Sequence, residues 1–161
     1  PGLAIIFAAI AHIGYMNGPK FTNPNILMLF TWTGWFFIIV GGSLWVRAAI
    51  VFGIDNLTML YVYFPEEGHM VNSSIYGVIR HPVYGAALRI SIGLALLNAG
   101  IYPIVCILIL SLGVFGWLRL VEEKELLERI PEYAEYRKRV PAFFPYPNRL
   151  PAFFNFLITG K

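Results

Sequence analysis

The chain has 161 residues, of which 58% are hydrophobic and only 13% are charged. Soluble domains contain about 25% charged residues and about 45 to 50% apolar ones, so this composition excludes a soluble globular domain. The mean hydropathy of +0.66 and the small formal net charge of +3 agree with an integral membrane protein. At roughly 20 residues per span, the length allows one domain of about four spans and little else.

Four apolar segments are candidates for membrane-spanning helices. The first is short for a full span, and because the chain starts at Pro1 without a methionine, we expect a truncated helix there rather than a signal peptide. The prediction is an all-α membrane protein that forms a single integral membrane domain, residues 1–161, with about four transmembrane helices. The spans are predicted at residues 3–16, 26–52, 83–97 and 101–120.

Turn formers and small residues mark the first half of the chain. The segments Asn17–Lys20 and Asn23–Asn25 combine Asn, Gly and Pro and are expected to break the helix. In the second span, the small residues Gly41–Ser43 permit close approach of another helix, and Arg47 can extend its guanidinium to water. Residues 55–79 are more polar and are predicted to form a loop, with short helical pieces.

The third and fourth apolar segments are separated only by Asn98–Gly100, and so short a link predicts an antiparallel helical hairpin. Pro82 suits the first position of its helix, and Pro103 the opening turn of the next, because the missing N–H would be unbonded there. Arg89, two turns into the third segment, would cost about 2.5 to 3.5 kcal/mol at mid-bilayer without a polar partner. It faces either a ligand cavity or a structural ion pair.

The C-terminal region changes character. Helical spacing continues after Leu120 but becomes amphipathic, and Pro131 restarts a helix whose acidic start and basic end suit the helix dipole. We expect cytoplasmic amphipathic helices here. Later prolines are expected to end regular structure, while phenylalanines keep this tail apolar, so it should lie on the membrane surface or cover a lipid-facing opening. The prolines are Pro141, Pro145, Pro147 and Pro151.

Cationic, titratable and aromatic side chains gather at Arg80–Gly85, directly before the hairpin. Either a bound ligand or an interfacial anchor would explain them. If the loop at residues 17–25 lies outside, only Lys20 of the twelve basic residues is there, and the rest lie on or near the cytoplasmic side. Both termini, the Arg80–Gly85 cluster and the acidic pair Glu122 and Glu123 would then share the cytoplasmic face.

Metal binding is not expected. The three histidines, His12, His69 and His81, are too scattered for a helical metal pair, and no Cys-x-x-Cys or His-Glu-x-x-His spacing occurs. Cys106, the single cysteine, lies in an apolar run, which favours a small buried thiol over a redox or metal role. No nucleic-acid partner is expected either.

Two sequence blocks flank the hairpin. Residues 68–85 contain Tyr76 followed by Arg80-His81-Pro82 and Tyr84, and residues 119–147 contain Glu122–Leu127, Tyr133, Tyr136 and Val140-Pro141. In this order they resemble the two motif blocks of the isoprenylcysteine carboxyl methyltransferase and phospholipid methyltransferase superfamily. Ser74 and Ile75 stand where that pattern commonly has Gly-Pro, and Ala142 stands where it often has arginine.

The resemblance implies S-adenosylmethionine as methyl donor, bound in a pocket that faces the cytoplasm. The methionyl end of this cofactor is a zwitterion, so its ammonium needs a carboxylate and its carboxylate needs cationic or N–H donors. Glu122 or Glu123 can meet the first need, and Arg80 or His81 the second. Tyr84 can place its ring against the adenine or the sulfonium. His69, Val71 and Tyr76 complete the implied cofactor-binding set.

The expected reaction is an in-line methyl transfer to a lipophilic acceptor that enters from the bilayer. Alignment of donor and acceptor can supply on the order of 7 to 11 kcal/mol of barrier reduction, so little acid-base power is needed. His81 is a candidate base for an amine acceptor. Arg89 and Arg137 are candidates to orient an anionic acceptor. A prenylated cysteine carboxylate, a phospholipid amine or a small thiol all fit this description.

Two other classes of function remain open on the sequence. Membrane sterol and steroid reductases have a related hairpin and bind NADPH, but they would require extra cationic residues for the 2′-phosphate and usually more spans. A non-enzymatic scaffold or lipid-binding protein would use the Arg80–Gly85 cluster as a headgroup anchor. In that protein Glu122 and Glu123 would simply pair with Arg119 on the same helix.

Overall fold

The computed structural model describes residues 12–52 and 74–160, and its regular elements there are helices plus one isolated bridge between Lys20 and Gly100. This confirms the all-α prediction for the described part of the chain. The fold divides into two compact units, the first made of Pro1–Gly42 and Ala86–Tyr133 and the second of Ser43–Gly85 and Ala134–Lys161. Most of the predicted span at 3–16 lies outside the described residues.

The long helix α2 (Pro24–Phe52) confirms that the predicted second span is helical. It starts where Asn23 ends the turn-forming segment, because the Asn23 Oδ1 accepts the backbone N–H groups of Asn25 at 3.0 Å and Ile26 at 3.3 Å. This is the expected behaviour of an asparagine N-cap, whose side chain satisfies N–H groups that have no partner within the helix.

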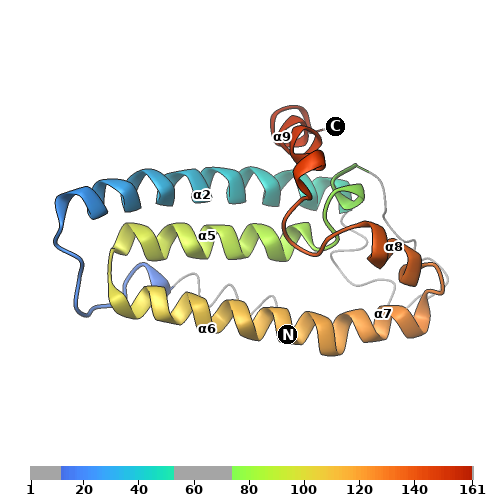
Figure 1. Cartoon of the computed structure of the whole chain (residues 1–161), viewed down its shortest axis with the longest axis horizontal. Coiled ribbons are helices and arrows are strands. Elements are labelled where there is room, and N and C mark those ends of the chain that lie inside the picture. Colours follow the sequence, from blue (N-terminus) through green and yellow to red (C-terminus); the bar gives the residue numbers. More distant parts are fainter. Residues whose placement is uncertain (1–11, 53–73, 161) are drawn as a thin grey trace. The chain divides into compact units, whose positions relative to one another are not determined.

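The predicted hairpin is formed by α5 (Pro82–Asn98) and α6 (Ile101–Trp117), which run antiparallel in Figure 1. The turn places Ala99 in the left-handed region, with φ 54°. The segment before α2 is tied to this turn: the Phe21 N–H donates to the Ala99 carbonyl, and the Asn98 amide donates to the Gly14 carbonyl, both at 2.9 Å. The hairpin turn is therefore a docking point for the N-terminal loop.

Within the first unit, α2 and α5 meet at glycines. A methyl group added at Gly93 would lie 2.6 Å from the Gly34 carbonyl oxygen, and one added at Gly41 would lie 2.9 Å from the Ala86 carbonyl oxygen. The predicted close approach at Gly41 is thus confirmed, whereas Gly42 faces open space. Glycine is required at the contact because any side chain would push the two backbones apart.

The α6 helix continues beyond the predicted end of the fourth span. A π-helical turn at Leu118–Glu122 leads directly into α7 (Glu123–Arg129), so the backbone stays helical as the side chains change from apolar to charged. The extra residue of a π turn rotates the following side chains around the helix axis. The predicted continuation of the helix is confirmed, and the π turn sets the direction of its first carboxylates. That this continuation is a cytoplasmic amphipathic helix stays a prediction.

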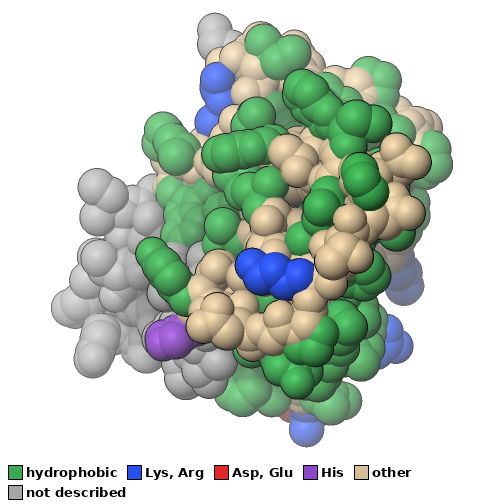
Figure 2. Space-filling model, turned by 90° about the vertical axis from the view of Figure 1, so that its left-hand side faces the viewer, with side chains coloured by type: hydrophobic (Ala, Val, Ile, Leu, Met, Phe, Trp, Pro, Cys, Tyr) green, Lys and Arg blue, Asp and Glu red, His purple; other side chains and the backbone are tan. Residues whose placement is uncertain are grey.

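Among residues 12–52 and 74–160, two helical runs are long and apolar enough to cross a membrane, Pro24–Val51 and Ile101–Arg129. Only 28% and 17% of the residues in their most apolar stretches are buried within the protein, so neither is a core helix of a soluble fold. Hydrophobic side chains also occupy much of the described surface on the face seen in Figure 2. The α5 helix, with 17 residues, is shorter, and its crossing of the bilayer stays a prediction.

The second unit is built from short helices around the C-terminal part of α2. A 3₁₀ turn, η2 (Ser74–Gly77), precedes α5, and α8 (Tyr133–Arg139) is the helix predicted after Pro131. After a further 3₁₀ turn, η4 (Pro147–Arg149), the chain forms α9 (Leu150–Thr159). The expectation that the last prolines end regular structure is wrong at α9, because Pro151 lies in its first turn, where proline breaks no helical hydrogen bond.

Candidate functional site

The Arg80-His81 dipeptide is joined to the second motif block by main-chain hydrogen bonds. The Arg80 N–H donates to the Pro141 carbonyl at 2.8 Å, and the His81 N–H donates to the Ala142 carbonyl at 3.0 Å. The two members of each pair are about 60 residues apart in the sequence. The first motif block and the C-terminal part of the second, around Pro141 and Ala142, are therefore joined within the second unit.

The Arg80 guanidinium reinforces the same junction. Its Nη1 donates to the carbonyl of Arg137 at 2.8 Å and also to the carbonyl of Val140, at the C-terminal end of α8. Carbonyls in the last turn of a helix have no partner within the helix and carry partial negative charge, so a guanidinium is well suited to them. Arg80 thus has a structural role that the sequence did not predict. Its predicted role in cofactor binding stays a prediction.

His81 is buried, with 6% of its surface exposed, between two aromatic rings. The ring of Tyr84, one turn into α5, meets it edge-on at a centroid distance of 6.1 Å, and the ring of Phe143 lies at the same distance. Pro82 is the first residue of α5, and a proline disfavours the helical conformation of the residue before it, so His81 lies just outside the helix. The imidazole is therefore held in an aromatic setting rather than exposed at the headgroup level, which argues against a simple interfacial anchor.

Tyr76 is a second buried member of the motif. The hydroxyl of Tyr136 on α8 donates to its backbone carbonyl at 2.6 Å, so α8 holds η2 in place. Burial, with a further contribution from the negative charge that Tyr136 would carry when ionised, raises the pKa of the Tyr76 phenol. Its hydroxyl therefore stays neutral at all physiological pH values and can act as a hydrogen-bond donor.

The acidic pair belongs to the first unit. Glu123 begins α7 directly after the π turn and is 4% exposed, while Glu122, the last residue of that turn, is partly exposed. The Glu123 N–H donates to the Leu118 carbonyl, the hydrogen bond that defines the π turn. π turns within α-helices are frequent at functional sites because they reorient side chains. A buried carboxylate at this position is suited to binding a cation.

The other predicted site residues lie as follows. Arg89 is 4% exposed on the face of α5 that meets α2, where its Cβ lies near Gly41. Arg137 is partly exposed in the last turn of α8, next to the carbonyl contact with Arg80. His69 and Val71 lie outside the described residues. The roles of all four in binding or catalysis stay predictions.

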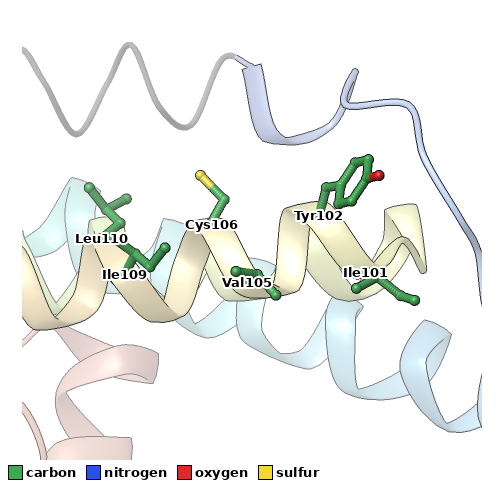
Figure 3. A pocket seen from close by; sticks show the side chains of 6 residues that line it. All are labelled: Ile101, Tyr102, Val105, Cys106, Ile109 and Leu110. Carbon is green, nitrogen blue, oxygen red and sulfur yellow. The ribbon is translucent and has the colours of Figure 1, made fainter.

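A separate apolar depression of about 580 Å³ runs along α6. In Figure 3, Tyr102, Cys106 and Leu110 point toward the same side of the helix. Cys106 is partly exposed, so the expectation of a buried thiol is wrong, while its lack of a redox or metal role stays a prediction. The reason is that this face of α6 is turned outward, as the exposure of Tyr102 and Ile109 also shows. None of the predicted site residues lines the depression, and its surface suits hydrocarbon rather than polar chemistry.

Comparison with known proteins gives a match to the family model for phospholipid methyltransferase, over residues 29–131. This covers more than half of the chain and includes most of α2, the hairpin, the Arg80-His81 dipeptide and the acidic pair. The chain belongs to the phospholipid methyltransferase family. No curated protein and no solved structure matches it. Together with its two exposed apolar helices, the family makes it a membrane methyltransferase.

Membership in the phospholipid methyltransferase family agrees with the resemblance that the motif blocks indicated. The matched region ends at Pro131, so α8 and Phe143 lie beyond it, although they contact Arg80 and His81 directly. Sequence reasoning named Phe143 only as an apolar tail residue. Its position three residues after Val140, at the end of the second block, was the signal that could have identified it.

The structure also explains one departure from the motif pattern. Ser74 adopts φ 53°, in the left-handed region that glycine enters without steric cost. Glycine is common at this position of the pattern because the turn into η2 requires that conformation. Ser74 makes the same turn, at a higher conformational cost than glycine would. The path of the backbone into Tyr76 is preserved.

We expect Arg80→Met to destabilise this phospholipid methyltransferase family member. Methionine keeps much of the aliphatic stem but removes the donors to the Arg137 and Val140 carbonyls, a loss of about 1.5 to 3 kcal/mol for charge-assisted hydrogen bonds. The midpoint of thermal unfolding in detergent measures the effect. Arg139→Met is the matched control, because this exposed arginine makes one long contact of 3.3 Å to the Glu135 carbonyl. Equal midpoints for the two variants would contradict the structural role of Arg80.

Proposed function

We propose that the protein transfers a methyl group from S-adenosylmethionine to a lipophilic acceptor that enters from the bilayer. The observation that carries the proposal is the junction between the two motif blocks, Arg80-His81 against Pro141-Ala142, in a chain of the phospholipid methyltransferase family. A headgroup anchor would need no such junction. Active-site orientation toward the cytoplasm, a multi-pass topology with four spans, and membrane lipids as partners belong to the same proposal.

The side chains present fit the chemistry of the cofactor. Buried Glu123 and partly exposed Glu122 offer carboxylates for its ammonium group, and a carboxylate attracts a cation more strongly when water is excluded. Arg80 or His81 offers donors for its carboxylate. The aromatic rings of His81, Tyr84 and Phe143 offer flat apolar surfaces for a purine or a sulfonium. When bound, S-adenosylmethionine supplies a methyl group that its sulfonium already activates.

The protein residues would then orient and shield rather than perform strong acid-base chemistry. Neutral Tyr76 adds no negative charge beside the cofactor-binding motif, because the pKa of its phenol is raised by burial. His81 would accept a proton if the acceptor is an amine, whereas a carboxylate acceptor needs no base. Arg89 and Arg137 would orient an anionic acceptor. His69 and Val71 keep the cofactor-binding roles that the motif implies.

Binding of radiolabelled S-adenosylmethionine to the purified protein in detergent, with NADPH as competitor, tests the cofactor. We expect saturable binding that NADPH does not displace, and at least tenfold weaker binding by His81→Ala, which loses donor and aromatic contacts worth about 1.4 kcal/mol or more. His12→Ala replaces an exposed histidine and is the control. Displacement by NADPH would favour a reductase, and absence of binding to either would favour a scaffold.

Transfer of labelled methyl groups into membrane lipid extracts tests the acceptor class. A methyl ester formed on a prenylcysteine carboxylate releases methanol on treatment with alkali, whereas a methylated phospholipid amine keeps its label. We expect label in the lipid fraction in one of these two forms. Label that stays entirely in S-adenosylmethionine while binding is intact would contradict the proposed lipophilic acceptor.

A further inference from the structure

The helix α9 carries two separate apolar faces. Phe153 and Phe156 are buried in the second unit, with 3% and 2% of their surfaces exposed. Leu150, Phe154 and Ile158 follow one another at intervals of four residues, so they form a stripe along one side of the helix. These three are 40%, 42% and 76% exposed. The stripe therefore faces outward, although it consists only of large hydrophobic side chains.

Polar residues complete the pattern. Asn155 and Thr159 are exposed and lie on a third side of α9, between the stripe and the buried face. Exposed Arg149 precedes the helix. The order around the helix is thus a buried face, an exposed apolar face and a polar face. A helix with an exposed apolar face next to a polar one, and basic residues nearby, suits the boundary between lipid headgroups and acyl chains.

Arg47 holds the C-terminal end of α9 beside the C-terminal part of α2. Its Nη2 donates to the Ile158 carbonyl at 2.8 Å, at the C-terminal end of α9, where Gly160 in the left-handed conformation (φ 78°) caps the helix. Arg47 lies in the C-terminal part of α2. Interfacial helices bury their apolar faces about 5 to 10 Å into the headgroup and acyl boundary. The hydrogen bond between Arg47 and α9 is suited to holding α9 at such a depth beside α2.

The direction of α9 agrees with this depth. Figure 1 shows α9 nearly along its own axis, whereas the C-terminal part of α2 runs across the view. A helix that lies crosswise to a membrane-crossing helix runs along the membrane plane. With 10 residues, α9 is about 15 Å long, half of the roughly 30 Å hydrocarbon thickness, so it cannot cross the bilayer itself.

We propose that α9 is an in-plane membrane-docking helix. Leu150, Phe154 and Ile158 insert among the upper acyl chains, Arg149 meets lipid phosphates, and Arg47 sets the depth. The occupant of the exposed face is the lipid bilayer. Because α9 contacts η2, which carries Tyr76, the docked helix joins the membrane surface to the cofactor-binding motif within the second unit. This inference rests on α2 as a membrane span and holds whichever cofactor or acceptor the protein uses.

Depth-dependent fluorescence quenching tests the proposal on the full chain. A Cys106→Ser background receives Ile158→Cys, labelled with an environment-sensitive fluorophore, in vesicles of phosphatidylcholine and phosphatidylglycerol. We expect blue-shifted emission, quenching by lipids with a nitroxide near the top of the acyl chain, and protection from aqueous iodide. Asn155→Cys is the matched control on the polar side of α9. Its label should be quenched by iodide and little affected by the nitroxide lipids.

Equal access of iodide to both labels would overturn the proposal, because α9 would then lie in water. Protection of both labels from iodide and from the nitroxide lipids would overturn it as well, since protein and not lipid would cover the stripe. The Arg47→Met variant tests the depth. Loss of its hydrogen bond to the Ile158 carbonyl should increase iodide quenching of the Ile158→Cys label, and unchanged quenching would contradict the role of Arg47.

Discussion

Replacing Glu123 with glutamine is expected to raise the Kd for S-adenosylmethionine about 10- to 100-fold. Glutamine has nearly the same shape, so the change removes the negative charge of a side chain that is 4% exposed and leaves the packing. Hydrogen bonds to a charged group contribute about 1.5 to 3 kcal/mol, and 1.4 kcal/mol corresponds to a factor of ten in Kd. Equilibrium binding of the labelled cofactor to the purified variant measures the loss.

Glu125→Gln is the control for this prediction. Glu125 lies on the same helix, is exposed, and forms an ion pair with Arg129 at 2.8 Å. Exposed ion pairs contribute little, so its Kd should match that of the unchanged protein. Glu122→Gln, made in parallel, shows which of the two carboxylates binds the ammonium group. Unchanged affinity in both the Glu122 and Glu123 variants, with normal thermal midpoints, would remove the acidic pair from the proposed site.

Replacing Gly93 with alanine is expected to destabilise the helical core of the first unit by about 1 to 3 kcal/mol, the usual range for overpacking. The added methyl group would lie 2.6 Å from the Gly34 carbonyl oxygen and 2.6 Å from Ile38 Cγ1. The backbone carbonyl cannot rotate away as a flexible side chain would, so α2 and α5 must separate. The midpoint of thermal unfolding in detergent should fall accordingly.

Gly113→Ala provides the opposite expectation within the same hairpin. Gly113 lies on α6, and an added methyl group there meets no atom within 4 Å. Because alanine is favoured over glycine inside a helix by about 0.5 to 1 kcal/mol, this variant should be neutral or slightly more stable. A similar decrease in both variants would show that helix glycines matter for some other reason than close packing.

Local sequence patterns were sufficient to predict the long helices. Uninterrupted apolar runs predicted α2 and α6, and the short link at Asn98–Gly100 predicted the hairpin, because both depend on residues close together in the chain. The same holds for the caps, since Asn23 and Pro82 act on the next turn of their own helices. The helix α9 was missed because it begins with a proline-containing turn that resembles a helix end.

Amino-acid sequence by itself determined the membrane class, the hairpin and the family motif, because composition, periodicity and motif order are properties of the linear chain. Tertiary structure decided the role of Arg80 at the end of α8, the burial of His81 between Tyr84 and Phe143, and the glycine contact between α2 and α5. Each of these joins residues that are far apart in the chain. Their pairing depends on how helices pack in three dimensions, and no local pattern encodes it.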